Sequence, residues 1–198
     1  MKQTRSFCLA SASPRRRALL RQFGFRFKVR PVSVDEKSMD GESPERLVAR
    51  LAQCKAQEAL HPIDSAASPP VLVIAADTIV VADGEVMGKP AGASDAARML
   101  RRLSGRTHRV LSAYALMEGG GPSVQRTVET QVVFRELPDA WIAWYSGLPE
   151  SRDKAGAYAI QGMGGAMVSH IEGSYQNVVG LPMERVVWDM IDMGWVIL

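Results

Sequence analysis

Apolar and polar positions alternate along this chain with two different periods, which is typical of a protein built from both helices and strands. Short apolar runs bounded by turn residues indicate buried strands, and apolar residues spaced three and four apart indicate amphipathic helices. The expected strands are residues 5–10, 25–34, 71–76, 107–117, 124–134 and 166–171, and the expected helices are 15–23, 44–60, 95–103, 138–146 and 182–193. Hairpins and crossovers both occur in this order, so we expect an α/β fold with a mixed sheet.

Capping and turn residues mark several of these boundaries. Ser43 is a good N-cap with proline at the first helical position behind it, and Pro14 stands near the start of the first helix. Ser94 is expected to cap the helix that ends at residue 103. Asp83-Gly84 predicts a tight hairpin turn. Residues 61–70, rich in Pro, Ser and Ala, are expected to form a loop.

Length and composition are ordinary for a soluble globular protein. The chain has 198 residues, of which 46% are hydrophobic and 23% charged. This length fits a single domain over residues 1–198, or two small lobes that share a core. Cys8 and Cys54, the two cysteines, lie in apolar-periodic segments and are expected to be buried reduced thiols. Because no apolar run approaches the length of a membrane span, we expect a cytoplasmic protein without a membrane partner.

Basic residues are concentrated at the N-terminus. Residues 1–34 contain nine Lys or Arg and no acidic residue, which leaves fifteen basic against twenty-one acidic residues in the remainder. A local positive field of this kind favours an anionic ligand, most simply phosphate. The alternative is a solvated basic face without a ligand.

The stretch LASASPRRRALL, residues 9–20, concentrates hydroxyl groups and arginines at a predicted strand-to-helix turn. A helix N-terminus offers free backbone N–H groups and the positive end of the helix dipole. Ser11 and Ser13 add hydroxyl donors, and Arg15 and Arg16 add guanidinium groups that can hold phosphate oxygens in pairs. These residues could form a polyphosphate cradle, or an ordinary capped helix whose arginines face solvent.

Asp77 interrupts the apolar run VLVIAADTIVV. Because an ionised carboxylate without a partner is very costly in such a place, it must end the strand at a cleft, pair with a cation or bind a metal. A carboxylate in a cleft is a candidate metal ligand or general base. The alternative is that Asp77 merely begins a turn with Thr78.

Lys55 falls in the middle of an apolar helical stripe. On a helical projection the apolar residues Val48, Leu51, Ala52 and Ala59 lie within about 140° of one another, and Lys55 lies among them. A lysine in this position either extends its ammonium group to solvent or points at something anionic.

Two glycine-rich segments could allow close approach of a ligand. They are Gly88-Lys89-Pro90 and residues 156–162, which end in Gln161-Gly162. Gln161 could read the edge of a base with its amide. Either segment could equally be a plain loop. The lysine segment is not a P-loop, because the glycine spacing is too short and proline replaces the Ser/Thr.

Five of these segments together resemble the Maf family. The matching segments, in order, are Leu9–Arg16, Ala76-Asp77-Thr78, Gly88-Lys89-Pro90, Lys154–Gly162 and Gly173–Pro182. Members of this family are nucleoside triphosphate pyrophosphatases first associated with septum formation in bacteria. The resemblance covers about residues 7–192.

The resemblance implies a Maf/ITPase-like fold, namely an elongated, two-lobed mixed sheet with flanking helices around a central cleft, commonly in a homodimer. It also implies hydrolysis of a nucleoside triphosphate to the monophosphate and pyrophosphate, with Mg²⁺ or Mn²⁺. The positions that match the family's catalytic residues are Arg16, Glu36, Lys55, Asp77 and Lys89, with Glu36 and Asp77 as metal ligands. The positions that match its substrate-binding residues are Ser11, Arg15, Arg16, Thr78 and Gln161.

Arg15, Thr78 and Gln161 are similar to the branch of the family that acts on dTTP and UTP. Two positions depart from the family pattern: Cys54 replaces a common acidic residue beside the lysine, and Ala159 replaces a common glycine near the implied base pocket. The departure at Ala159 bears on which base is selected more than on the catalytic reaction.

Three alternatives remain at this stage. One is a nucleotide-binding regulator of cell division that does not need turnover, and another is a pyrophosphatase for a different nucleotide such as 7-methyl-GTP. The third, a nucleic-acid binder, is disfavoured by the few aromatic residues and the acidic remainder of the chain, so we expect no nucleic-acid partner.

Overall fold

The computed structural model describes residues 1–61 and 70–198. Its helices are α1 (Pro14–Gln22), α2 (Pro44–Leu60), α3 (Ala93–Leu103), α4 (Asp139–Ser146), α5 (Tyr175–Val179) and α6 (Met183–Asp192). Its strands are β1 (Lys2–Gln3), β2 (Ser6–Leu9), β3 (Phe27–Val29), β4 (Val71–Ala82), β5 (Glu85–Met87), β6 (Thr107–Glu118), β7 (Ser123–Phe134), β8 (Val168–Glu172) and β9 (Val196–Ile197). Short 3₁₀ turns cover Pro149–Ser151, Ala155–Ala157 and Met163–Met167.

The described strands form a mixed sheet, as predicted. A seven-stranded sheet has the order β3-β2-β4-β6-β7-β8, with β5 added beside β4. β2 pairs in parallel with both β3 and β4, whereas β4–β5 and β7–β8 are antiparallel. The chain divides into two compact units: unit 1 is residues 1–77, 112–128 and 180–198, and unit 2 is residues 78–111 and 129–179. The single-domain prediction for residues 1–198 stays a prediction.

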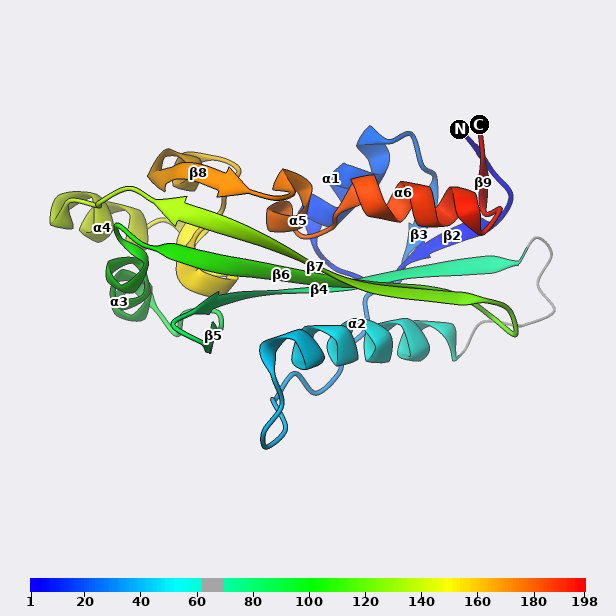
Figure 1. The fold of residues 1–198 in the computed structure, drawn as a ribbon, viewed down its shortest axis with the longest axis horizontal. Coiled ribbons are helices and arrows are strands. Elements are labelled where there is room, and N and C mark those ends of the chain that lie inside the picture. The colour runs from blue at the N-terminus through cyan, green and yellow to red at the C-terminus, as the bar shows by residue number, and fades with distance from the viewer. Residues whose placement is uncertain (62–69) are drawn as a thin grey trace. The chain divides into compact units, whose positions relative to one another are not determined.

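Unit 1 has helices on both faces of its part of the sheet. Figure 1 shows α2 on one face, and α1 and α6 on the other. Proline at the first position and a serine N-cap start both α1 and α2, since the hydroxyls of Ser13 and Ser43 accept from backbone N–H groups three residues on. The predicted starts of these two helices are therefore confirmed. The first and last strands, β1 and β9, form an antiparallel pair.

Buried polar contacts hold the C-terminal segment of unit 1, which contains α6 and Trp195, against β6 and β7. Asp189 of α6 accepts the Tyr114 hydroxyl at 2.5 Å and pairs with the Arg126 guanidinium at 2.7 Å. Further along, the indole N–H of Trp195 donates to Glu118 at 2.7 Å. Because these buried carboxylates have strong donors, they hold α6 and the chain end on the sheet without an unpaired charge.

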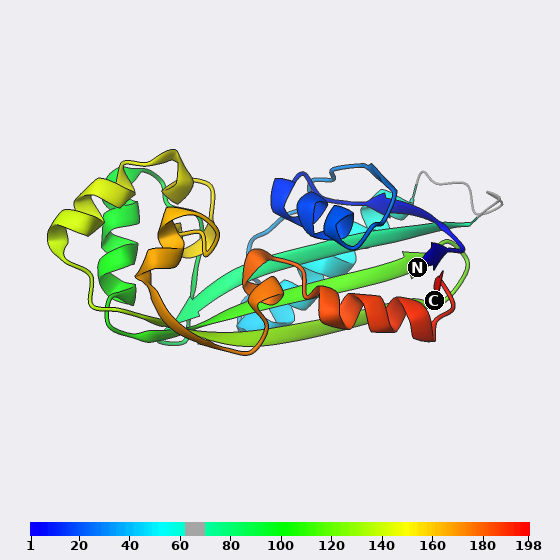
Figure 2. The ribbon, with the colours of Figure 1, turned by 90° about the horizontal axis from the view of Figure 1, so that it is seen from above.

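Unit 2 packs α3 and α4 beside each other, as both ribbon views show (Figures 1 and 2). The core of unit 2 includes Met99, Leu103, Phe134, Ile142 and Tyr158, all nearly inaccessible to solvent. Its helices therefore bury one apolar face each, in keeping with their amphipathic pattern.

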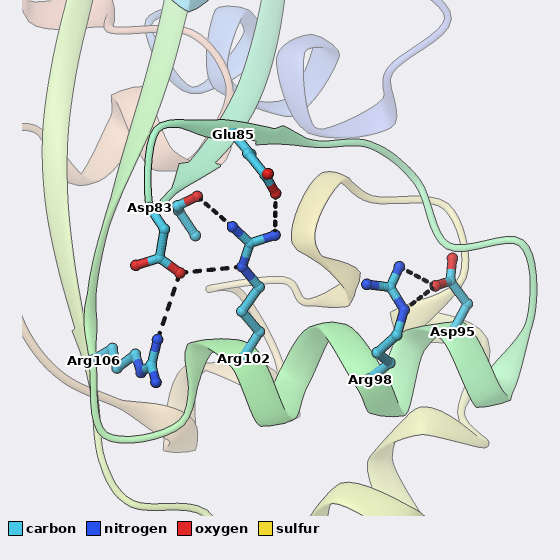
Figure 3. A network of polar contacts seen from close by, with 7 residues as sticks. Asp83, Glu85, Asp95, Arg98, Arg102 and Arg106 are labelled. Carbon is cyan, nitrogen blue, oxygen red and sulfur yellow. Dashed lines mark hydrogen bonds and ion pairs between the residues drawn. The ribbon is translucent and has the colours of Figure 1, made fainter.

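An ion-pair cluster ties α3 to the β4–β5 hairpin in unit 2 (Figure 3). Arg102 donates to Asp83 at 3.2 Å and to Glu85 at 2.7 Å. Asp83 and Gly84 both have positive φ, 52° and 79°, which confirms the predicted tight turn. The acidic side chains are largely exposed, so the cluster is expected to add little stability.

Several sequence predictions need correction. The strand expected over 25–34 is limited to β3, where only Phe27–Val29 pair with β2. The strand expected at 71–76 continues to residue 82, because β5 and β6 extend its pairing. Helix α3 begins at Ala93 behind Gly92 and not behind Ser94. Most of the loop expected at 61–70 lies outside the described residues.

Smaller differences concern the chain ends and the thiols. The short elements β1, β9 and α5 were not expected, since each is too short to show a period. Both cysteines are free, but only Cys8 is buried, while Cys54 is half-buried. Within the two described ranges, no helix combines the length and the apolar character that a membrane crossing requires.

Candidate active site

One lysine and two carboxylates meet in unit 1. Lys55 Nζ on α2 lies 2.7 Å from Asp77 Oδ1 and 2.6 Å from Glu36 Oε1. The side chains of Lys55 and Asp77 are only 11% and 12% exposed, whereas that of Glu36 is 56% exposed. Of the alternatives left open by the sequence, the one in which Lys55 points at an anionic group and the one in which Asp77 pairs with a cation are confirmed. One ammonium group compensates both carboxylates, which lets Asp77 remain buried.

Asp77 does not end its strand, contrary to one of the sequence interpretations. β4 continues past it for five residues, of which the last four, residues 79–82, are buried. The strand can continue because Lys55, on the helix that covers the sheet, donates to the Asp77 carboxylate. The carboxylate therefore does not need solvent at a strand end to compensate its charge. The alternative, in which Asp77 merely begins a turn with Thr78, is wrong, because both residues lie within β4.

The first helix N-terminus forms the candidate phosphate cradle. Ser13 is the N-cap, and its Oγ accepts from the Arg16 backbone N–H at 3.4 Å. Ser11 is 8% exposed, and its Oγ accepts from Ser13 N–H and from an Arg16 guanidinium nitrogen at 3.1 Å. Arg16 Nε also donates to the Gly180 carbonyl at 2.8 Å. The guanidinium is therefore fixed in orientation from both sides, and does not point freely into solvent.

The charges of the cradle and the carboxylates interact. Burial lowers the pKa of the Arg16 guanidinium from its ordinary value, and attraction to Asp77 opposes that shift. Repulsion from Arg15 lowers the same pKa further, and Glu36 raises it. Such coupling places the cradle arginines and the lysine–carboxylate group in one electrostatic region of unit 1. An anion entering this region would meet fixed positive charge beside two carboxylates.

The remaining predicted residues lie in unit 2. Thr78 follows Asp77 in β4 and is half-buried. Because successive side chains of a strand point to opposite faces, Thr78 and Asp77 face opposite sides of the sheet. Lys89 and Gln161 are both exposed. Their two glycine-rich segments are joined by a backbone hydrogen bond of 3.2 Å from Gly156 N–H to the Gly88 carbonyl. Unit 2 thus brings together the two segments that the sequence could only mark separately.

Sequence reasoning missed the residues that support these segments. The Gly180 carbonyl receives Arg16 from a position 164 residues away. In unit 2, Tyr145 and Glu150 bond to the backbone around Gln161. No periodic or spacing signal marks these partners, because each contact depends on the tertiary fold.

The donor set in unit 1 suits a hard divalent cation. Among the residues that the structure describes, no group of three or more His, Cys, Asp or Glu side chains could hold a metal ion unaided. Mg²⁺ is commonly held by one or two carboxylates together with substrate phosphates and water. Glu36 and Asp77, gathered by one ammonium group, match that pattern of ligation.

Comparison with known proteins identifies relatives over most of the chain. The family model described as Maf-like protein matches residues 6–192. The chain is 50% identical over 178 residues to a dTTP/UTP pyrophosphatase of Anaeromyxobacter dehalogenans, covering 88% of this chain and 87% of the relative. It is 48% identical to a dTTP/UTP pyrophosphatase of Symbiobacterium thermophilum over 187 residues, covering 94% and 93%.

Solved structures add agreement on the fold. The Ham1 protein of Staphylococcus aureus aligns with a TM-score of 0.51 at 12% identity, over 96% of this chain and 97% of that protein. At such low identity the likeness concerns the mixed α/β fold alone. The family match and the two close relatives together decide the assignment: the chain belongs to the family of Maf-like proteins.

Proposed function

We propose that this chain hydrolyses nucleoside triphosphates, with dTTP and UTP as substrates, to the nucleoside monophosphate and pyrophosphate. Relatives at 48–50% identity bear the name dTTP/UTP pyrophosphatase. The observation that carries the proposal is the group in which Lys55 bridges Glu36 and Asp77, in electrostatic contact with the Arg16 cradle. This arrangement offers both a base and fixed positive charge to a phosphoanhydride.

The proposed roles follow from the contacts. Asp77 would orient or deprotonate a water for in-line attack on the α-phosphorus, and Lys55 would hold that carboxylate in place. Arg16 would balance charge that shifts onto the leaving pyrophosphate, since its guanidinium is already oriented. Lys89 is proposed to share that task. Ser11 and the backbone N–H groups of α1 would fix the phosphates.

Glu36 and Asp77 are the residues proposed to hold a divalent cation together with triphosphate oxygens and water. When bound, Mg²⁺ or Mn²⁺ would offset charge on the triphosphate and polarise a phosphoryl oxygen. Arg15, Thr78 and Gln161 are proposed to contact the nucleoside. These assignments are supported by residue types that match the family and by the geometry within each unit.

The decisive measurement is pyrophosphate release by the purified protein across common and modified nucleoside triphosphates, with Mg²⁺ or Mn²⁺. We expect the fastest release from dTTP or UTP. Asp77→Asn should lower turnover at least about 100-fold, because the carboxylate acts on the attacking water. Asp192→Asn, at an exposed position on α6, is the matched control and should turn over like the wild type.

Lys55→Ala separates catalysis from packing. We expect a large loss of turnover, because the ammonium group contacts two carboxylates of the candidate site. The melting temperature should also fall, because the buried Asp77 carboxylate loses its cation. Wild-type turnover with a lower melting temperature would assign Lys55 to stability alone. Tight nucleotide binding without turnover by the wild type would favour the regulator of cell division, and a preference for 7-methyl-GTP would replace the proposed substrates.

Three related expectations remain proposals. The family resemblance supports a homodimer, which light scattering would test. A cytoplasmic location is supported by the two free cysteines. The absence of a nucleic-acid partner would be contradicted by strongly salt-dependent oligonucleotide binding.

A further inference from the structure

The segment that carries Gln161 in unit 2 has an unusual backbone. It runs from Ala159 to Gly164, with Gly162 at φ +91°. This segment has no strand or long helix of its own, because only a 3₁₀ turn begins at Met163. A short irregular segment keeps one conformation only when surrounding groups bind its backbone.

Glu150 supplies such a group. This residue lies in the 3₁₀ turn after α4, and its carboxylate accepts the Gly164 N–H at 2.9 Å and the Met163 N–H at 3.4 Å. The same carboxylate accepts the Tyr145 hydroxyl at 2.8 Å. Three donors therefore converge on one side chain, and two of them belong to the Gln161 segment.

Tyr145 connects the other end of the segment to the same carboxylate. Its hydroxyl accepts the Ala159 N–H at 3.2 Å while it donates to Glu150. The ring is fully buried. Gln161 thus lies between two backbone anchors, Ala159 and Gly164, that are joined through one tyrosine and one glutamate.

Close packing leaves no room for a side chain at Gly162 or Gly164. A Cβ on Gly164 would lie 2.3 Å from the Ala159 carbonyl oxygen and 2.5 Å from the Tyr145 hydroxyl. A Cβ on Gly162 would lie 2.6 Å from a Glu150 carboxylate oxygen. The glycines therefore allow the backbone to approach the two side chains to hydrogen-bonding distance.

The carboxylate is suited to this task because it stays ionised. Burial alone would raise the pKa of Glu150. The donors from Gly164, Tyr145 and Met163, together with the charge of Lys154, outweigh burial and lower that pKa below its ordinary value. Hydrogen bonds to a charged acceptor are stronger than those between neutral groups.

We propose that Tyr145 and Glu150 are positioning residues that fix the backbone from Ala159 to Gly164 and thereby determine how selectively Gln161 discriminates nucleobases. The inference rests on the proposed function, since it assigns the selectivity of that site. Neither side chain needs to touch the nucleotide. The departure at Ala159 fits this picture, because Tyr145 bonds to its backbone N–H and not to its side chain.

The test compares Glu150→Ala, Glu150→Gln and Tyr145→Phe with the wild type. The readout is the ratio of kcat/KM for dTTP to kcat/KM for CTP, with Mg²⁺ present. We expect the ratio to fall about tenfold in Glu150→Ala and in Tyr145→Phe, as for the loss of one well-placed hydrogen bond. Glu150→Gln should recover most of the ratio, because its amide oxygen can still accept from Tyr145 and Gly164.

Matched controls separate positioning from stability. Glu172→Ala and Tyr175→Phe remove the same groups from exposed positions in unit 2 and should keep the wild-type ratio. The inference is overturned if Glu150→Ala and Tyr145→Phe lower the melting temperature but keep the ratio within about twofold of the wild type.

Amide hydrogen exchange of residues 159–165 gives a second readout that needs no turnover. Faster exchange there in Glu150→Ala than in Glu172→Ala supports the anchoring, and unchanged exchange refutes it. If the wild type releases pyrophosphate from no nucleotide, the proposed function fails, while the exchange result still decides whether the two residues fix the segment.

Discussion

The buried imidazole of His108 predicts a specific loss of stability in mild acid. His108 on β6 is 2% exposed, and its Nε2 lies 2.8 Å from the Tyr158 hydroxyl. The Phe134 and Tyr158 rings pack against it nearly at right angles, with their centroids 4.9 Å and 5.4 Å from the centre of the imidazole. Among the described residues, Nδ1 has no hydrogen-bond partner. Burial lowers the pKa of His108 from 6.5 to about 4, because a charged imidazolium would be poorly solvated there.

The sign and size of the effect follow from linkage. The folded pKa lies below the unfolded one, so the unfolded state binds more protons as pH falls through the window from about 6.5 to about 4. The stability contribution is therefore complete above the unfolded pKa and is lost on acidification. A pKa difference of this size corresponds to about 2 kcal/mol lost by pH 5 and about 3 kcal/mol by pH 4.

His108→Gln removes the titrating group and keeps a polar side chain opposite Tyr158. The free energy of unfolding is measured by urea titration at pH 7 and pH 5, with circular dichroism as the signal. The wild type should lose about 2 kcal/mol more than His108→Gln between these pH values. His170→Gln controls for removal of an imidazole at the surface. Parallel pH dependence in the wild type and His108→Gln would refute the reasoning.

Three stability predictions follow from other contacts. Gly164→Ala should lower the melting temperature, measured by scanning fluorimetry, because its Cβ would clash with the Ala159 carbonyl oxygen. An unchanged melting temperature would show that the backbone adjusts and would contradict this prediction. Asp189→Asn should cost about 1–3 kcal/mol in urea unfolding, since the buried Tyr114 hydroxyl loses a charged acceptor; an effect near zero would contradict this. Arg102→Ala should cost at most about 1 kcal/mol in the same assay, because its acidic partners are exposed, and a larger loss would show that the cluster in Figure 3 is structural.

Local chemistry explains which parts of the fold could be predicted. Serine followed by proline at residues 13–14 and 43–44 determines two helix starts without help from the rest of the chain. Asp83-Gly84 determines its turn in the same way. The odd residues Lys55 and Asp77 could be recognised as special, because each has a polar group where the local pattern requires an apolar one.

Partners far apart in the chain could not be predicted in the same way. Nothing in the pattern pairs Lys55 with Glu36, because the latter lies in a segment without regular structure. The apolar residues Ile79-Val80-Val81 continue the pattern beyond Asp77, but whether the strand passes through a carboxylate depends on a distant partner for that carboxylate and on the neighbouring strands. Likewise, Tyr145 reads as an ordinary core residue until its hydroxyl is seen beside Glu150.

The division of the chain also has a consequence for synthesis on the ribosome. Unit 2 ends at residue 179, whereas unit 1 still needs residues 180–198. Every residue of unit 2 has therefore been made before β9 can pair with β1, or before the Gly180 carbonyl can receive Arg16. Domains usually fold in the order in which they emerge, but here the unit that begins first is completed last. A nascent chain paused at residue 179 would carry an N-terminal strand and a cradle arginine that still await their final partners.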